Sequence, residues 1–171
     1  MTLKGPPYSE ELQDYLLEHS MPRSVVHDRL VQVTHDSLGD TARMQIAPEQ
    51  GAFLTLLVRL MGARTAVEIG TFTGLSALCI AEGLPDDGQL TCVDISEHWT
   101  SIGIPFWEEA GLADRIELVI GPAAHTLAAT PLDRPIDFAF IDADKDGYSL
   151  YVDLILDRMR PGGLIVVDNA L

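Results

Sequence analysis

Two different spacings of apolar residues divide the chain near residue 64. Before that point, apolar residues recur every three or four positions, as they do in amphipathic helices. Together with capping residues, this spacing predicts helices over about residues 9–19, 24–39 and 48–62. From Thr65 onward, short apolar runs alternate with segments of helix length, so a different architecture begins there.

The second part of the chain repeats strand and helix in turn. Its apolar runs are "TAVEI", "QLTCV", "IELVI", "IDFAFI" and "GLIVV", each bounded by Gly, Pro or Asp. Two of the segments between or after these runs predict helices over about 96–111 and 148–159. Strands that alternate with helices pair in parallel and are covered on both faces. We therefore predict an α/β fold with a Rossmann-like, doubly wound, mainly parallel sheet and additional N-terminal helices.

The length of the chain limits the number of domains. Its 171 residues, of which 47% are apolar, suffice for one domain with a core and are too few for two ordinary domains. We expect a single domain over residues 1–171, with a helical part at 1–62 and an α/β core at 63–171.

Charge and composition narrow the range of partners. The formal net charge is −15, from 26 acidic and 11 basic residues, and a field of that sign repels a nucleic-acid backbone. No apolar run reaches the roughly 18 residues that span a bilayer, and the N-terminus lacks the layout of a secretory signal. Cys79 and Cys92 lie in apolar segments, as buried thiols do in a reducing compartment. We expect a cytoplasmic protein that acts on a small molecule, without a nucleic-acid or membrane partner.

Ligands of parallel sheets bind beyond the carboxyl ends of the strands. After the first run comes "EIGTFTGLSA", in which Gly70 and Gly74 allow a tight turn and a close approach to a ligand. Glu68 stands where the dinucleotide-binding fingerprint Gly-x-Gly-x-x-Gly has its first glycine. A carboxylate at that position is unfavourable beside a pyrophosphate and favourable beside an ammonium or sulfonium group. The alternative is a glycine-rich turn that binds no ligand.

Asp94 ends the second run, 20 residues after Gly74. A carboxylate at this place can accept hydrogen bonds from both ribose hydroxyls of a nucleoside, or it can cap the following helix. Together the two motifs favour an adenosine ligand with a cationic amino-acid arm. S-adenosylmethionine meets both requirements.

Five segments carry a resemblance to a known family. The segments "VEIGTFTGLSA", "CVDIS", "GPA", "FIDADKDGY" and "GGLIVVDNAL" stand in the order and spacing of the cation-dependent O-methyltransferases. Over about residues 44–171 the chain resembles the caffeoyl-CoA O-methyltransferase group and, more distantly, catechol O-methyltransferase. The resemblance implies S-adenosylmethionine as cofactor, a divalent cation and a hydroxylated small-molecule acceptor.

The resemblance also implies roles for individual residues. The cofactor would be bound by Met44, Glu68, Gly70, Ser76, Asp94, Ala123, Asp142 and Asp144. The cation would be held by Asp142, Asp168 and Asn169, and the catalytic residues would be Lys145 and Asp142.

The same acidic residues suit a metal ion on chemical grounds. Asp142 follows the fourth run, and Asp168 and Asn169 follow the fifth, so adjacent parallel strands would bring their oxygen atoms together. Without His or Cys, these hard donors favour Mg²⁺ and also suit Mn²⁺ or Ca²⁺. Three protein ligands leave three octahedral positions, enough for two neighbouring hydroxyl oxygens of a catechol-like acceptor and one water.

Each of these polar residues also has a simpler interpretation. Asp144 and Asp146 suit the start of a helix, and a lone Lys145 is commonly a solvated side chain. Asp168 and Asn169 alone would form an ordinary turn. Their joint placement at two strand ends favours the metal site over these alternatives.

Histidine and tryptophan contribute less to the prediction. The five histidines show no metal-binding spacing, and we expect them at surface or structural positions. Trp99 and Trp107 lie in the predicted helix at 96–111, where packing on the sheet is favoured over a position beside the adenine.

The leading hypothesis is an S-adenosylmethionine- and divalent-metal-dependent O-methyltransferase that acts on a hydroxyl of a catechol-like or related small molecule. One alternative is a cofactor-binding or dimerisation module without catalysis, and a less favoured one is a nicotinamide-dependent oxidoreductase. The family continues beyond the position of Leu171, so we expect the C-terminal end of the chain to be incomplete. The apolar N-terminal helices predict a homodimer.

Overall fold

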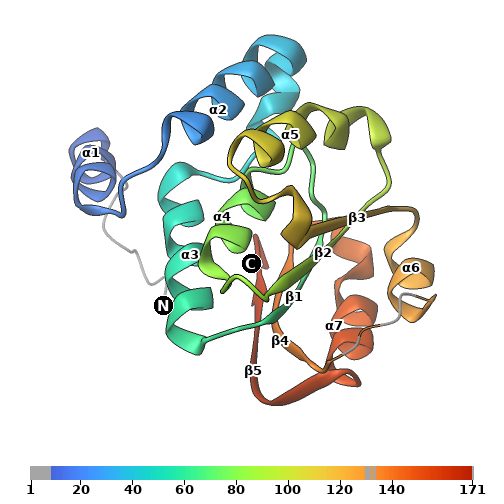
Figure 1. Ribbon diagram of the computed structural model, residues 1–171. Coiled ribbons are helices and arrows are strands. Elements are labelled where there is room, and N and C mark those ends of the chain that lie inside the picture. Colours follow the sequence, from blue (N-terminus) through green and yellow to red (C-terminus); the bar gives the residue numbers. More distant parts are fainter. Residues whose placement is uncertain (1–8, 130–131, 133, 171) are drawn as a thin grey trace, which may run out of the picture.

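Five strands form the centre of the computed structural model, which describes residues 9–129, 132 and 134–170 (Figure 1). The strands are β1 Thr65–Ile69, β2 Gln89–Asp94, β3 Ile116–Ile120, β4 Ile136–Ile141 and β5 Met159–Val167. Their order is β3-β2-β1-β4-β5, and every neighbouring pair is parallel. This arrangement confirms the predicted parallel α/β sheet and places β4 beside β5.

The helices alternate with the strands, as the sequence predicts. The α-helices are α1 Glu10–His19, α2 Val25–Leu38, α3 Pro48–Met61, α4 Leu75–Gly83, α5 Glu97–Glu109, α6 Ala123–Ala129 and α7 Tyr148–Leu156. Short 3-10 helices are η1 Gly39–Met44, η2 Ala113–Arg115 and η3 Lys145–Gly147. Local capping sets two of the starts: Ser9 Oγ accepts the N–H of Leu12 at 3.2 Å, and α3 begins on Pro48.

One predicted boundary is wrong. The helix predicted over about 148–159 ends at Leu156, because Met159 is already the first residue of β5. The segment "MRPGG" interrupts the ladder, because Ile136 of β4 pairs with Met159 whereas Phe138 pairs with Leu164. Pro161 lacks an N–H for the ladder, which explains why regular pairing stops there.

Helices cover both faces of the sheet. In Figure 1, α3 and α4 lie on one side of it, and α6 and α7 lie on the other. The first core joins Leu30, Leu54 and Trp107 to Phe138 and Phe140 of the sheet. The second core joins Leu127 and Ile155 to Val67, Ile69 and Ile141. Because α2 and α3 share the first core with the sheet, we retain the prediction of a single domain; the division at residues 62 and 63 stays a prediction.

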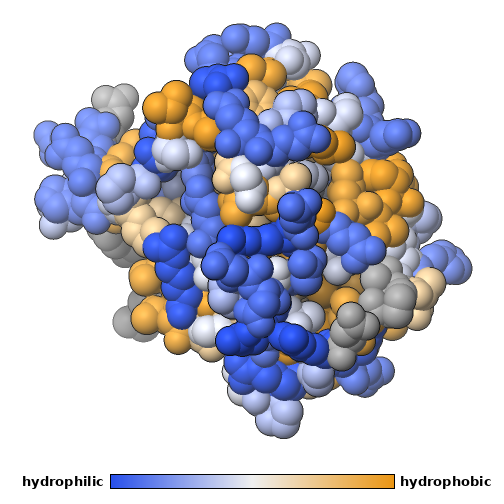
Figure 2. Space-filling view, viewed as in Figure 1, coloured by the Kyte–Doolittle hydropathy of each residue, from blue (hydrophilic) through white to orange (hydrophobic). Residues whose placement is uncertain are grey.

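Hydrophilic residues cover much of the face in Figure 2, and apolar residues form separate patches on it. Among the residues that the structure describes, no helix combines the length and the apolar character needed to cross a membrane.

A carboxylate joins three strands at the end of the sheet where β4 begins. Asp137 Oδ2 accepts the N–H groups of Arg64 at 2.7 Å and Thr65 at 2.9 Å, and Oδ1 pairs with Arg160 of β5. Burial alone would raise the pKa of Asp137, but these hydrogen bonds outweigh it, so the pKa is lowered. The ionised Asp137 side chain therefore connects β1, β4 and β5.

The substitution Asp137→Ala is expected to lower the free energy of unfolding by about 2 kcal/mol at pH 7, because two backbone N–H groups and Arg160 lose their acceptor. Urea unfolding followed by circular dichroism measures the change. The stabilisation is fully present above the unfolded-state pKa near 3.8 and is lost as pH falls through the lowered folded-state pKa.

The control for this experiment is Asp153→Ala, at an exposed position of α7, which should change stability by less than about 0.5 kcal/mol. Equal effects of the two substitutions at pH 7 would contradict the role assigned to Asp137.

Candidate active site

A cavity of about 780 Å³ opens at the carboxyl ends of the strands. The loops after all five strands contribute to its wall, together with residues of η1 and the start of α3. Cavities of this size are typical of small-molecule binding sites.

The hydrogen-bond ladder of the sheet continues one residue beyond the strands, into this wall. The N–H groups of Gly70, Gly121, Asp142 and Asp168 donate to the carbonyls of Val93, Asp94, Ile69 and Ile141, respectively, over 2.8–2.9 Å. Each of these wall residues therefore has a backbone position that the neighbouring strand fixes.

The loop after β1 requires glycine at two positions. Gly70 has φ +89°, and a Cβ atom on it would lie 1.9 Å from the carbonyl oxygen of Asp142. Gly74 has φ +81°, and a Cβ atom there would lie 2.4 Å from the ring of Trp107. The loop can thus lie close against β4 on one side and α5 on the other.

Asp94 fixes the same loop through its side chain. Its Oδ2 accepts the N–H groups of Thr71 at 2.9 Å and Phe72 at 2.8 Å, and its Oδ1 accepts the N–H of Ser96 at 2.7 Å. Ser96, not Asp94, is the N-cap of α5, because Ser96 Oγ accepts the N–H of Trp99. The carboxylate also lines the cavity, so binding of ribose by Asp94 stays a prediction that this position allows.

The two tryptophans have different surroundings. Trp107 is buried and donates its Nε1–H to the carbonyl of Gly74 at 3.1 Å, which confirms the packing role expected for it. Trp99 instead lines the cavity and meets Phe72 edge-on, with ring centroids 5.3 Å apart. The sequence favoured packing on the sheet for both tryptophans. For Trp99 the alternative, a position at the binding cavity, agrees better with the structure.

Glu68 lies behind the cavity wall rather than in it. Its side chain is 0% exposed and is absent from the cavity lining, whereas Ser76 lines the cavity. Cys92 Sγ donates weakly to Oε2 at 3.4 Å, and Oε1 accepts no hydrogen bond of ordinary geometry from the described residues. Burial raises the pKa of Glu68 to about 7, and the neighbouring Ser76, Cys92 and Thr71 side chains offset only part of that rise.

Asp142 and Asp168 face the cavity at the ends of β4 and β5. Burial raises the pKa of Asp142, the charge of Asp168 raises it further, and Lys145 partly opposes both. Lys145 Nζ lies 3.9 Å from Asp142 Oδ1 and donates to the backbone carbonyl of Asp168 at 3.2 Å. Two carboxylates and one ammonium group therefore share this end of the cavity.

Tyr148 and Asn169 complete that end. The hydroxyl of Tyr148 accepts a hydrogen bond from Lys145 Nζ at 2.7 Å and donates to the carbonyl of Asp168 at 3.0 Å. Asn169 has φ +50° and its amide donates to Asp168 Oδ2 at 2.7 Å. The turn of Asp168, Asn169 and Ala170 after β5 is thus fixed by hydrogen bonds to both the side chain and the backbone carbonyl of Asp168.

Asp144 has a partner that the sequence does not reveal. Tyr151 of α7 donates its hydroxyl to Asp144 Oδ1 at 2.6 Å, and both residues line the cavity. Burial, followed by the hydrogen bond to Asp144, raises the pKa of Tyr151 to about 12. Asp144 makes no side-chain cap at the following helix, unlike the simple interpretation of its position.

The structure gathers nearly all predicted site residues around one cavity. Its wall includes Met44, Gly70, Ser76, Asp94, Ala123, Asp142, Asp144, Lys145, Asp168 and Asn169, and the exception is Glu68. The wall also includes residues that the sequence does not single out, among them Arg43, Gln50, Ile95 and Tyr151. The roles of all these residues stay predictions.

No group of three or more His, Cys, Asp or Glu side chains in a metal-binding arrangement exists within residues 9–129, 132 and 134–170. The predicted cation site has only two carboxylates, and its third donor is the amide of Asn169.

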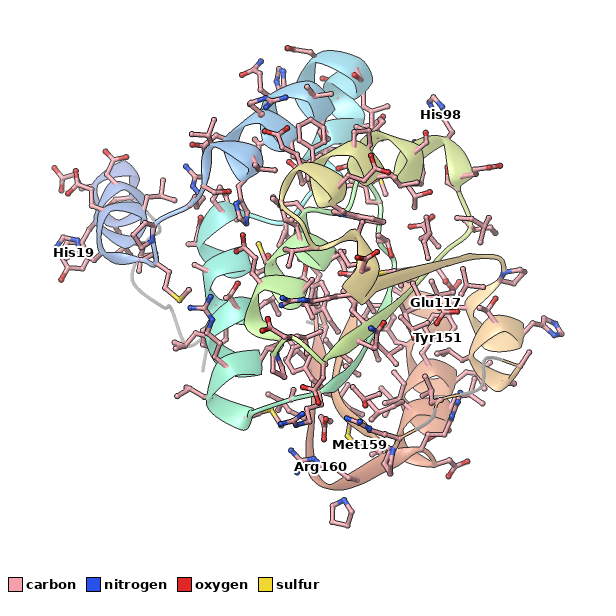
Figure 3. All side chains as sticks on the ribbon, in the orientation of Figure 1. His19, His98, Glu117, Tyr151, Met159 and Arg160 are labelled. Carbon is pink, nitrogen blue, oxygen red and sulfur yellow. The ribbon has the colours of Figure 1, made fainter. Side chains whose placement is uncertain are left out.

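His19 and His98 are exposed, as expected for surface residues, and they lie at opposite sides of the molecule (Figure 3).

Comparison with known proteins identifies the family. A family model described as O-methyltransferase matches residues 17–171. The chain belongs to the O-methyltransferase family. This membership favours methyl transfer over the nicotinamide-dependent alternative.

Relatives of this O-methyltransferase are similar over nearly its whole length. The probable caffeoyl-CoA O-methyltransferase 2 of Dictyostelium discoideum is 35% identical over 167 residues, which cover 96% of this chain and 72% of the relative. Caffeoyl-CoA O-methyltransferase 5 of Nicotiana tabacum is 38% identical over 171 residues, with 95% and 70% covered.

Solved structures agree with the fold of this O-methyltransferase. The O-methyltransferase from Bacillus cereus in complex with S-adenosylhomocysteine has a TM-score of 0.85 at 34% identity, over 93% of this chain and 72% of that one. The O-methyltransferase TomG from Streptomyces achromogenes in complex with S-adenosylmethionine has a TM-score of 0.85 at 31% identity, with 93% and 71% covered.

The substitution Glu68→Gln is expected to remove a pH dependence of stability. Folding favours the neutral form, because the folded-state pKa is raised from 4.5 to about 7, so stability falls as pH rises between these values. Relative to the unaltered protein, the variant should gain on the order of 3 kcal/mol of unfolding free energy between about pH 5 and pH 8. Urea unfolding of the cofactor-free protein at several pH values measures this.

A matched control is Glu117→Gln, at an exposed position of β3 (Figure 3). It should show the same pH dependence as the unaltered protein. A Glu68→Gln curve parallel to that of the unaltered protein would refute the raised pKa.

Proposed function

We propose that this O-methyltransferase transfers a methyl group from S-adenosylmethionine to a hydroxyl of a catechol-like small molecule, with a divalent cation held by Asp142, Asp168 and Asn169. The observation that carries the proposal is the position of these oxygen donors at the ends of the adjacent strands β4 and β5, in the wall of one large cavity. The cofactor complexes of the Bacillus and Streptomyces relatives support the choice of cofactor.

The cavity wall provides complementary groups for each part of this cofactor. Asp94 and the backbone near Ala123 suit the ribose and the adenine end, and Trp99 offers an aromatic edge beside them. No side chain caps α4, so the N–H groups of its first turn and the hydroxyl of Ser76 suit the cofactor carboxylate. Glu68 behind them adds negative potential when ionised, which favours the cationic arm.

The donor set at β4 and β5 suits a cation such as Mg²⁺. Two carboxylates and one amide are hard oxygen ligands, and after burial the charge of Asp168 raises the pKa of Asp142, so the two carboxylates lie close enough to act on one ion. A bound divalent cation would supply the positive charge that favours the phenolate form of an acceptor whose hydroxyl has a pKa of about 10.

The protein's own residues then position and stabilise the acceptor. Tyr148 raises the pKa of Lys145 most, through its hydrogen bond, so this ammonium group stays charged beside the developing oxyanion. Lys145 Nζ could accept the phenolic proton only as a neutral amine, which would require a bound cation to lower its pKa. The O–C bond forms as the S–C bond breaks, so the main requirement on the cavity is alignment of oxygen, methyl carbon and sulfur.

The substitution Asp142→Ala tests the proposal. We expect methyl transfer to a catechol to fall at least about 100-fold, because the cation loses one of its two carboxylates, while S-adenosylmethionine stays bound. A chelator should have the same effect on the unaltered protein, and added Mg²⁺ should reverse it. A coupled assay measures transfer, and isothermal titration calorimetry measures cofactor binding.

Asp146→Ala is the matched control, because Asp146 lies two residues after Asp144 and does not line the cavity. It should retain turnover. Turnover that is indifferent to chelation, or retained in Asp142→Ala, would overturn the role of the cation without affecting cofactor binding.

We also propose that the protein is cytoplasmic and forms a homodimer. Two buried free cysteines, Cys79 and Cys92, suit a reducing compartment. Phe53, Leu56 and Leu60 form an exposed apolar stripe on α3, with 53%, 41% and 74% of their surface accessible. A stripe of this kind at helical spacing is typical of a surface that pairs with a partner.

The substitution Leu60→Glu should convert the proposed dimer into a monomer, because it places a charge in the stripe. Light scattering at several concentrations measures the mass. Leu156→Glu on α7, where the side chain is 54% exposed, is the control and should leave the dimer intact. A monomeric unaltered protein at working concentration would contradict the proposal.

A further inference from the structure

Arg43 differs from the other basic side chains that the structure describes. Each of the others has a carboxylate or carbonyl partner: Arg23, Arg29, Arg59, Arg64, Arg115, Arg134, Lys145, Arg158 and Arg160. The side chain of Arg43 has no hydrogen bond, ion pair or ring contact with any described residue. In a protein with a net charge of −15, an arginine without an acidic partner is unexpected.

This arginine lies in the wall of the active-site cavity, on η1, with an exposed side chain. The segment that carries it is firmly attached. Two residues further along, Gln45 Nε2 donates to Thr34 Oγ1 at 3.0 Å and to Thr73 Oγ1 at 2.9 Å, and both threonines are fully buried. The backbone next to Arg43 is thereby connected to the loop after β1, so the guanidinium group is held near the cavity.

The described acidic residues of the cavity wall already have partners. Asp94 accepts three backbone N–H groups, Asp142 lies beside Lys145, Asp144 accepts from Tyr151, and Asp168 accepts from Asn169. Among the described residues, Arg43 is therefore the one charged side chain in the cavity wall that has no hydrogen-bond or ion-pair partner.

An unmatched guanidinium group beside a binding cavity is suited to an anion of the ligand, because its planar donors fit a carboxylate or a phosphate. One candidate anion is the carboxylate of the cofactor. However, the first turn of α4 and the hydroxyl of Ser76 already provide hydrogen-bond donors for that group. This leaves the acceptor as the source of the anion.

We propose that Arg43 recognises an anionic group of the acceptor, a carboxylate or a phosphate, and makes the enzyme prefer a charged catechol to its neutral analogue. The inference rests on the methyl-transfer function proposed above. It assigns a specificity-determining role to Arg43: the acidic protein repels an anionic acceptor in general, and Arg43 offsets that repulsion where the acceptor enters.

The test compares three acceptors that share one catechol: caffeic acid, which carries a carboxylate; its methyl ester, which is neutral; and caffeoyl-CoA, which carries phosphates. The kcat/KM of each is measured for the unaltered protein, for Arg43→Gln and for Arg134→Gln. Arg134 lies before β4, outside the cavity lining, so its substitution removes the same charge elsewhere.

We expect the unaltered protein and Arg134→Gln to favour one of the two anionic acceptors over the ester by about tenfold, and Arg43→Gln to lose most of that preference through KM. Loss of the preference for caffeic acid identifies a carboxylate as the anion, and loss only for caffeoyl-CoA identifies a phosphate. The preference should also decrease as salt is added.

An unchanged preference of Arg43→Gln for the anionic acceptors over the neutral ester would overturn the inference. If the variant then also binds S-adenosylmethionine more weakly, the arginine is assigned to the cofactor carboxylate.

Failure of the proposed function gives a different result, namely no turnover of any catechol by the unaltered protein. In that case calorimetric titration of the acceptors into the S-adenosylhomocysteine-loaded protein replaces the kinetic comparison. The same ratio, now of dissociation constants, then decides whether Arg43 binds the anion.

Discussion

The arrangement of the cavity depends on the last hydrogen bond of each parallel strand pair. In a parallel ladder each residue is tied to its neighbour at a fixed offset, so the residue just beyond a strand inherits a position set by the adjacent strand. Gly70, Asp142 and Asp168 are connected in this way across β2, β1 and β4. Consequently, side chains that are far apart in the sequence meet at one edge without needing long-range contacts of their own.

The acidic side chains near this edge are accommodated by different physical means. Asp94 is surrounded by backbone N–H groups, Asp144 accepts a phenolic hydroxyl, and burial raises the pKa of Glu68 to about 7. Asp142 is the least compensated, since Asp168 repels it and only Lys145 opposes that repulsion. The repulsion between carboxylates is thus strongest at the ends of β4 and β5, where a bound cation would offset it.

The strands and most residues of the cavity wall can be predicted from the sequence. Apolar runs mark the strands, and the polar or glycine residues of the wall stand at or just after the end of each run. The exceptions have physical reasons. Glu68 alternates with Val67 and Ile69, so its side chain points to the face covered by α3 and α4 and not to the strand ends. The partnership of Tyr151 with Asp144 depends on how α7 packs. Arg43 belongs to no motif, and only its lack of a side-chain partner among residues 9–129, 132 and 134–170 distinguishes it.

The contrasting positions of the two tryptophans have an optical consequence. Trp99 borders the cavity in contact with Phe72, whereas Trp107 is enclosed behind Gly74 and donates a hydrogen bond to it. They are the only two tryptophans in the 171-residue sequence. Entry of an aromatic ligand therefore changes the emission of one indole while the other acts as an internal reference, so the protein carries its own fluorescent reporter of cavity occupancy.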